Sequence, residues 1–301
     1  MTGWPSGKDR IQAECPRPDR TLPLVIRASD ARIDLVSWAT DNLSILEAAL
    51  RKHGALLFRG FTVSGVAGFE RFVFAMSGPL MGYQDRGTPR SRVSGNIYTA
   101  TDYPPEHTIF LHNESSFADT FPLRIYFFCL TPPREGGETP IADVRRVFER
   151  IPPEVREPFL QGGVLYVRNL GGAAGLSWET VFQTTDRAAM EEYCRVAGIE
   201  FEWRGGNRVR TRQVRPAAAR HPRTGEMVWF NHAAVLHVST LPPALGGMLR
   251  KMFKEEDLPN NTYYGDGSPI ETAALDAIRG AYREEEVTLP WEEGDVLMLD
   301  N

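Results

Sequence analysis

Short β-type segments separated by turn signals limit this chain to a narrow set of folds. They lie at residues 55–58, 123–130, 164–167, 208–214, 227–230 and 296–299, with turns such as Thr224-Gly225 and Glu293-Gly294-Asp295 between them. Helical patterns do not alternate one for one with these segments, which disfavours a doubly wound parallel sheet. The pattern therefore predicts a mainly β fold with flanking helices, of the barrel or jelly-roll type.

Several helices are marked by the spacing of apolar residues and by capping residues. Asp41 is expected to cap a helix that Gly54 terminates, and Asp143 to cap one that stops before Pro152-Pro153. The segment Ser268-Pro269-Ile270-Glu271 has the sequence of a capping box and predicts a further helix start.

Composition excludes several classes of protein. The 301 residues are 42% hydrophobic and 24% charged, with a net charge of -5, which is typical of a globular protein and disfavours a nucleic-acid partner. No apolar run is long enough for a membrane span or a signal peptide. Its 3 cysteines are isolated, which predicts no disulfides and a cytoplasmic location. We expect a loose N-terminal tail over residues 1–22 and a single domain over residues 23–301, with homo-oligomer formation left open.

One short segment carries a metal-ligand pattern. On an extended strand His112 and Glu114 point to the same side, and an imidazole plus a carboxylate make two-thirds of a 2-His-1-carboxylate facial triad for Fe(II). By itself this spacing also occurs on ordinary surface strands.

The flanking sequence resembles the taurine catabolism dioxygenase (TauD/TfdA-like) family of Fe(II)/2-oxoglutarate-dependent oxygenases. The resemblance runs in order over most of the chain, through residues 53–61, 121–130, 136–143, 220–231 and 294–301. It implies a double-stranded β-helix, the cupin-like jelly roll, with helices packed outside. It also implies Fe(II) as cofactor, with 2-oxoglutarate and O2 as cosubstrates.

Carried over by position, the resemblance makes His112 and Glu114 the first two iron ligands. Thr139, in Gly136-Gly137-Glu138-Thr139, matches the residue that supplies a hydroxyl to a 2-oxoglutarate carboxylate. Many members have Asp at the position of Glu114, whereas Glu resembles a branch of syringomycin-type amino-acid hydroxylases from nonribosomal peptide biosynthesis. Halogenating relatives have a small residue there, so Glu114 disfavours halogenation.

The resemblance predicts hydroxylation of an unactivated C–H bond of an amino acid, free or bound to an acyl or peptidyl carrier protein, in secondary metabolism. Desaturation or ring closure would use the same residues. Two other classes stay open, a ligand-binding jelly roll without turnover and a metal-dependent hydrolase. The hydrolase is disfavoured because no His-x-x-x-His pair completes a zinc site.

Other charged and imidazole side chains have two interpretations. Arg208, Arg210 and Arg212 alternate along one strand face, which is either a solvated surface or a site for a substrate carboxylate or an acidic carrier protein. Arg212 is our candidate for that contact. Family members carry a histidine matching His237, which is a second candidate substrate residue, whereas Gln is expected at His232. Both histidines also suit hydrogen-bonded core positions.

The C-terminal segment lacks two residues that the resemblance leads us to expect. In the family, a strand like residues 294–301 leads to a His-Gly-Arg segment with the second iron histidine, followed by an arginine for 2-oxoglutarate. We expect both beyond Asn301, the histidine within about ten residues, because a facial triad needs three ligands. The alternative is that His237 or His232 replaces the missing ligand.

Overall fold

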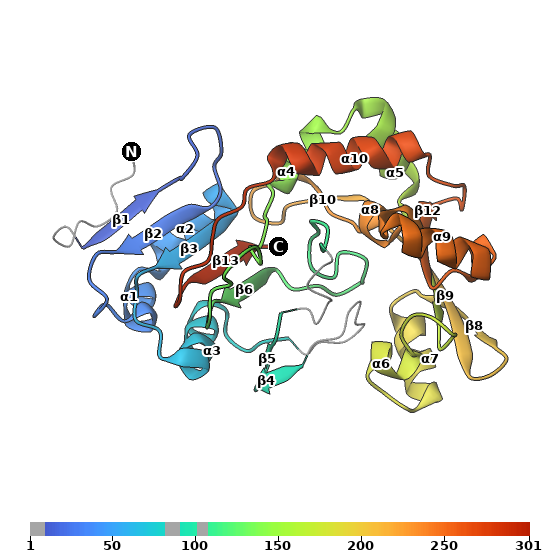
Figure 1. Cartoon of the computed structure of the whole chain (residues 1–301), viewed down its shortest axis with the longest axis horizontal. Coiled ribbons are helices and arrows are strands. Elements are labelled where there is room, and N and C mark those ends of the chain that lie inside the picture. The colour runs from blue at the N-terminus through green and yellow to red at the C-terminus, as the bar shows by residue number, and fades with distance from the viewer. Residues whose placement is uncertain (1–9, 82–90, 101–107) are drawn as a thin grey trace.

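The computed structural model describes residues 10–81, 91–100 and 108–301 (Figure 1). Its larger sheet has five strands in the order β1-β2-β3-β13-β6. Strands β2 and β3 are parallel and the other neighbours antiparallel. The bounds are Ile11–Glu14 (β1), Leu24–Ala28 (β2), Ala55–Arg59 (β3), Val296–Asp300 (β13) and Arg124–Phe128 (β6).

A second, fully antiparallel sheet has four strands in the order β12-β7-β9-β8. The bounds are Asn260–Tyr264 (β12), Val164–Leu170 (β7), Arg208–Arg215 (β9) and Glu200–Arg204 (β8). Two small hairpins pair β10 (Ala218–Arg220) with β11 (Met227–Trp229) and β4 (Arg92–Ser94) with β5 (Ile97–Tyr98). The fold is thus a mixture of sheets and helices, and in the described residues each sheet is open rather than closed into a barrel.

Helices fill the connections between strands. They are α1 (Leu35–Asp41), α2 (Leu43–His53), α3 (Gly65–Ser77), α4 (Val144–Arg150), α5 (Pro153–Gly162), α6 (Trp178–Phe182), α7 (Arg187–Val196), α8 (Ala233–Leu236), α9 (Pro243–Met252) and α10 (Thr272–Glu285), with 3-10 turns η1 (Val238–Thr240) and η2 (Glu255–Asp257).

The helix signals are confirmed at two positions and wrong at two. Asp143 caps α4 by accepting from the Arg145 N–H, and Gly54 ends α2 with φ 73°. Asp41 is not a cap, because it is the last residue of α1, which Asp34 caps.

The capping box at Ser268 does not form either. The α10 helix begins only at Thr272, because the Ser268 hydroxyl bonds to Asp266 and the Glu271 carboxylate accepts from the Tyr264 hydroxyl.

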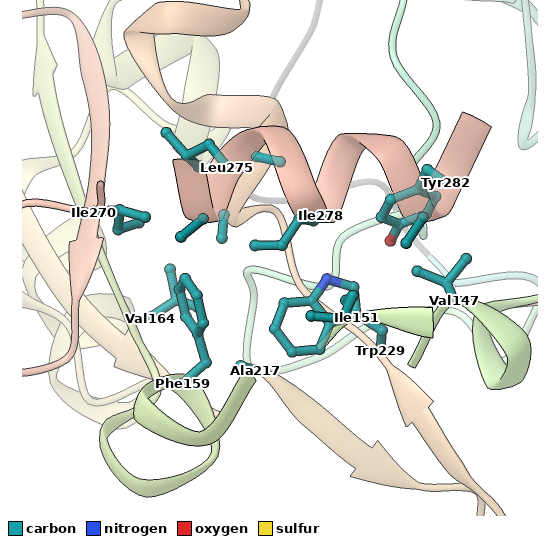
Figure 2. Packing of buried hydrophobic residues seen from close by; sticks show 14 of the residues in the cluster. Val147, Ile151, Phe159, Val164, Ala217, Trp229, Ile270, Leu275, Ile278 and Tyr282 are labelled. Atoms are coloured by element: carbon teal, nitrogen blue, oxygen red, sulfur yellow. The ribbon is translucent and has the colours of Figure 1, made fainter. Parts of the chain in front are cut away.

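The largest apolar cluster lies beneath α10, which packs against α4 (Figure 2). Ile278 and Leu275 on α10 face Trp229 and Phe159, whose rings meet edge to face with centroids 5.6 Å apart. Two further clusters cover the two faces of the five-stranded sheet, so β3 and β13 are buried on both sides. This explains why their sequences are continuous apolar runs.

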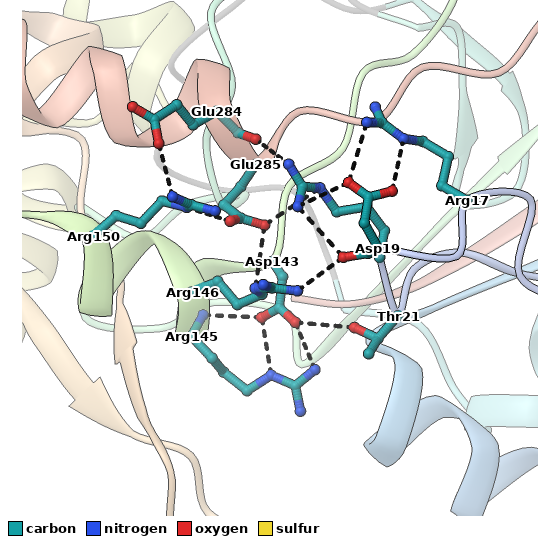
Figure 3. A network of polar contacts seen from close by, with 10 residues as sticks. Arg17, Asp19, Thr21, Asp143, Arg145, Arg146, Arg150, Glu284 and Glu285 are labelled. Carbon is teal, nitrogen blue, oxygen red and sulfur yellow. Dashed lines mark hydrogen bonds and ion pairs between the residues drawn. The ribbon is translucent and has the colours of Figure 1, made fainter.

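The tail expected over residues 1–22 does not stay loose from residue 10 onward; residues 1–9 lie outside the described part of the chain. Residues Ile11–Glu14 form β1, and Leu22 is buried. Arg20 contacts the buried carboxylate of Glu285 at 3.6 Å and donates to the Glu284 carbonyl. Beside it, Thr21 donates to Asp143 at 3.5 Å, and Arg146 on α4 donates to the Asp19 carbonyl at 3.2 Å (Figure 3). No local sequence signal marks this attachment, because the ionic partner Glu285 is at the end of α10, more than two hundred residues away.

No helix in the described residues combines the length and the apolar character that a membrane span requires.

Candidate active site

The segment that carries His112 and Glu114 is irregular rather than a strand. Residues 108–113 have no regular structure and a turn begins at Glu114, which differs from the expected extended strand. Burial nevertheless alternates: Leu111 and Asn113 are buried, while His112 and Glu114 are half-buried. That the imidazole and the carboxylate lie on one side of the segment stays a prediction.

The hydrogen bond of His112 suits a metal ligand. Its Nδ1 lies 2.8 Å from the Phe110 carbonyl oxygen, so Nδ1 carries the proton and donates it. The lone pair is then on Nε2, the atom left for a metal ion. Metal-binding histidines are commonly oriented by such a bond from the other ring nitrogen.

The main chain of Glu114 is held by the side chain of Asn301. Asn301 Oδ1 accepts from the Glu114 N–H at 2.7 Å, and Asn301 Nδ2 donates to the Glu114 carbonyl at 2.9 Å and the Pro122 carbonyl at 2.7 Å. Asn113 Nδ2 in turn donates to the main-chain oxygen of Asn301 at 2.6 Å.

A second histidine lies beside His112. The ring centroids of His112 and His232 are 5.0 Å apart, and His232 Nδ1 is 2.8 Å from the Ser116 hydroxyl. Burial, and secondarily the nearby His112, lowers the pKa of His232 well below its usual range. His232 is therefore a neutral, buried neighbour of the candidate ligands, which agrees with its interpretation as a hydrogen-bonded core histidine.

His237 lies at the other end of α8 and contacts a different region. Its Nδ1 is 2.7 Å from the Ser239 hydroxyl. Burial, with Arg279 and Arg250 nearby, lowers the pKa of His237 to about 4. These contacts fit the alternative interpretation of His237 as a hydrogen-bonded core residue.

The described residues bring no complete set of metal donors together. Across residues 10–81, 91–100 and 108–301, no three His, Cys, Asp or Glu side chains gather closely enough to hold a metal ion. Neither His232 nor His237 is thus brought into a three-donor set with His112 and Glu114. His112 and Glu114 stay the predicted first two ligands of a facial triad; of the two, Glu114 lines the large cavity described next and His112 does not.

Glu114 lines a cavity of about 660 Å³ at the free edge of β6. One wall is apolar and comes mainly from α3, with Phe69, Val73 and Met76. The volume falls in the range of small-molecule sites.

The opposite part of the cavity wall is rich in arginine. The Glu47 carboxylate on α2 is 2.5 Å from Arg124, 2.8 Å from Arg223 and 3.6 Å from Arg51. One carboxylate thus faces three guanidinium groups, so these four side chains carry excess positive charge, while Glu114 and Asp300 line the same cavity and balance it. We call these four residues the arginine wall. Only the Glu47/Arg51 pair, at i and i+4, has a local sequence signal.

Thr139 lines a different and much smaller cavity, of about 20 Å³, together with Arg59 and Trp291. It is absent from the wall of the large cavity. Its predicted contact with 2-oxoglutarate stays a prediction.

The arginines of β9 alternate outward as expected, with Val209 and Thr211 buried between them. Arg210 binds Asp257 at 2.7 Å and the Asn169 amide oxygen at 2.9 Å, so it is engaged within the fold. Arg212 is exposed, lies opposite Glu200 on β8, and does not line the cavity with Glu114.

Comparisons with known proteins agree with the sequence pattern. The profile described as "Taurine catabolism dioxygenase TauD, TfdA family" matches residues 18–301. The dapdiamide synthesis protein DdaC of Enterobacter agglomerans is 36% identical over 287 residues, which cover 93% of this chain and 87% of that protein. A clavaminate synthase-like protein of Arabidopsis thaliana is 31% identical over 267 residues, covering 85% and 77%.

Among solved structures, PvcB of Pseudomonas aeruginosa is similar in fold, with a TM-score of 0.56 over 98% of this chain and 84% of PvcB. A second PvcB structure, described as an Fe, alpha-ketoglutarate dependent oxygenase from an isonitrile synthetic pathway, gives a TM-score of 0.57 over 100% and 86%. At 15% and 14% identity these two likenesses concern the fold alone.

Proposed function

The chain belongs to the taurine catabolism dioxygenase TauD, TfdA family, and on that premise we propose that it hydroxylates an unactivated C–H bond of an amino acid in secondary metabolism. It is an Fe(II)- and 2-oxoglutarate-dependent oxygenase. The relative DdaC is named for dapdiamide synthesis, which supports a role in secondary metabolism. The double-stranded β-helix is part of the same proposal, supported by the two sheets with helices around them. So is the single domain over residues 23–301, supported by the family match.

One observation carries the substrate assignment: Glu114 lies on the wall of the same cavity as an arginine cluster and an apolar surface. An amino acid has a carboxylate that the arginine cluster can bind and a carbon chain that can pack on the apolar surface. Arg223 and Arg51 are partly exposed within the arginine wall, and a guanidinium group binds a carboxylate through paired hydrogen bonds. A substrate bound there would place its carbon chain toward α3 and Glu114.

In this mechanism His112 Nε2 and the Glu114 carboxylate would hold the iron. When bound, Fe(II) with 2-oxoglutarate and O2 supplies the oxidising chemistry, which places one oxygen atom in the C–H bond and releases succinate and CO2. The Phe110 carbonyl fixes the His112 tautomer, because it accepts the Nδ1 proton. Phe69, Val73 and Met76 exclude water from one wall, and the arginine wall aligns the substrate so that one C–H bond is presented.

A carrier-bound amino acid is a variant of the same proposal. The exposed Arg212 would contact an acidic carrier protein, although Glu200 and Glu202 on β8 lie opposite Arg212 and Arg210 and balance part of that charge. The free amino acid is therefore the form that the cavity favours.

Succinate release measured over a panel of amino acids, free and carrier-bound, tests the proposal. We expect release to rise strongly with one or a few amino acids that have both a carboxylate and an aliphatic chain. Release that no amino acid stimulates would contradict the substrate assignment. Binding of a ligand with no succinate at all would point to the ligand-binding protein without turnover.

A further inference from the structure

Asn301 pairs with Glu114 as a neighbouring strand would. Its side-chain oxygen accepts from the Glu114 N–H and its side-chain nitrogen donates to the Glu114 carbonyl, at 2.7 and 2.9 Å. The second proton of that nitrogen goes to the Pro122 carbonyl at 2.7 Å. Every donor of the Asn301 amide is thus used, and two of its three bonds fix the backbone of the candidate iron ligand.

The backbone that Asn301 holds has an uncommon conformation. Ser115, the next residue, has φ 56°, in the left-handed region that non-glycine residues rarely adopt. Such a conformation persists only when the surroundings impose it. The surroundings here are Asn301 on one side and, on the other, His232, which bonds the Ser116 hydroxyl at 2.8 Å.

Asn301 is itself rigidly placed. It follows β13, which pairs on one side with β3 and on the other with β6. Its own N–H donates to the Leu123 carbonyl at 2.9 Å, and Asn113 donates to its main-chain oxygen at 2.6 Å. Through Asn301, the main chain of Glu114 is therefore fixed relative to the central strands of the five-stranded sheet, although its own segment is irregular.

We propose that Asn301 is a positioning residue that sets the direction of the Glu114 carboxylate for metal binding. The proposal rests on the proposed function, because it takes Glu114 as an iron ligand. Removing the Asn301 amide would let the Ser115 backbone relax and would turn the carboxylate away from His112. Loss of a residue that orients a metal ligand typically lowers metal affinity by about 10- to 100-fold.

A purely structural role would give a different result, and Asn169 provides the matched control. Like Asn301 it is a half-buried amide that donates to two main-chain carbonyls, those of Glu256 and Leu258 at 3.0 and 2.7 Å. Asn169 lies on β7 and does not line the cavity that Glu114 lines. If Asn301 only stabilised the fold, Asn169→Ala and Asn301→Ala would change metal affinity alike.

The experiment has two readouts. The first is hydrogen exchange of the Glu114 amide in the metal-free protein, which should become about tenfold faster in Asn301→Ala through loss of one hydrogen bond. The second is equilibrium binding of Mn(II) alone, followed by electron paramagnetic resonance. We expect about 10- to 100-fold weaker binding in Asn301→Ala and wild-type affinity in Asn169→Ala. Asn301→Gln keeps the amide donors and the acceptor on a longer side chain and should lose less, which also keeps the test usable if the alanine variant does not fold.

Glu114→Ala separates failure of this proposal from failure of the proposed function. If Glu114→Ala abolishes Mn(II) binding while Asn301→Ala and Asn301→Gln bind like the wild type, the positioning role is wrong and the ligand assignment stands. If Glu114→Ala binds Mn(II) like the wild type, or the wild type does not bind it, the ligand assignment is wrong and this proposal falls with it.

Discussion

Breaking the buried ion pair between Arg59 and Asp295 should destabilise the protein strongly while leaving the candidate site intact. Arg59 Nε is 3.0 Å from Asp295 Oδ1, and Arg59 Nη2 is 2.6 Å from Asp295 Oδ2. The Asp295 side chain is 0% exposed and that of Arg59 is 8% exposed. The pair joins β3 to the turn that leads into β13, and neither residue contacts Glu114.

The expected size follows from this burial. Removing one partner of a buried pair leaves an uncompensated charge and costs about 3–5 kcal/mol. Arg59 also has a partly exposed partner, Glu292, at 2.9 Å, so Asp295→Ala should fall at the lower end of that range. With an unfolding entropy of about 2.1 cal/mol/K per residue, 3–5 kcal/mol in a chain of this length lowers Tm by roughly 5–8 °C.

Urea unfolding of the wild type, Asp295→Ala, Arg59→Met and the double variant measures the effect. The double variant should recover a large part of the loss, because it leaves no unpaired charge. Mn(II) affinity of the folded single variants should match the wild type. The reasoning is refuted if the free energy of unfolding of either single variant is within about 1 kcal/mol of the wild-type value. It is also refuted if the loss in the double variant equals the sum of the losses in the two single variants.

Three further predictions concern the residues singled out in the sequence. Thr139→Ala should raise the 2-oxoglutarate concentration needed for half-maximal succinate release by roughly 10- to 150-fold, because a hydrogen bond to a charged group contributes about 1.5–3 kcal/mol. An unchanged 2-oxoglutarate requirement would remove Thr139 from the cosubstrate site. Arg212→Glu should weaken binding of a carrier-bound substrate, more at low than at high salt, and leave the affinity for the free amino acid unchanged. If the variant and the wild type bind the carrier-bound substrate equally at low salt, the β9 arginines are an ordinary solvated face. Because the pKa of His237 is lowered to about 4 in the folded protein, its contribution to stability is complete above the unfolded pKa near 6.5 and is lost as the pH falls toward 4. Between about pH 7 and about pH 4.5, the free energy of unfolding in urea should therefore fall less for His237→Gln than for the wild type. The same fall in both proteins would contradict this prediction.

The parts of the fold that could be predicted are those with strong local signals. Residues 164–167 and 296–299 form strands because they are continuous apolar runs buried on both faces. Asp143 and Gly54 act as helix ends through their own side chain and backbone conformation. The Ser268 capping box failed because its two polar groups found other partners, Asp266 and Tyr264.

The candidate site, too, could be predicted only where its sequence signal is local. The spacing of His112 and Glu114 is local and was visible, whereas the bond from Asn301 to Glu114 joins residues 187 positions apart. The arginine wall likewise gathers Arg124 and Arg223 around Glu47 from distant segments. No periodicity or spacing in the sequence encodes such contacts, because they depend on how β6 and β13 come together.

The visible absorption of the protein with Fe(II) and 2-oxoglutarate, recorded without oxygen, tests the iron assignment most directly. We expect the wild type to develop a weak charge-transfer band, and His112→Ala to lose it while its circular dichroism is unchanged. A wild-type protein without the band, or a His112→Ala variant that keeps both the band and its full iron content, would contradict the assignment of His112 and Glu114 as the iron ligands.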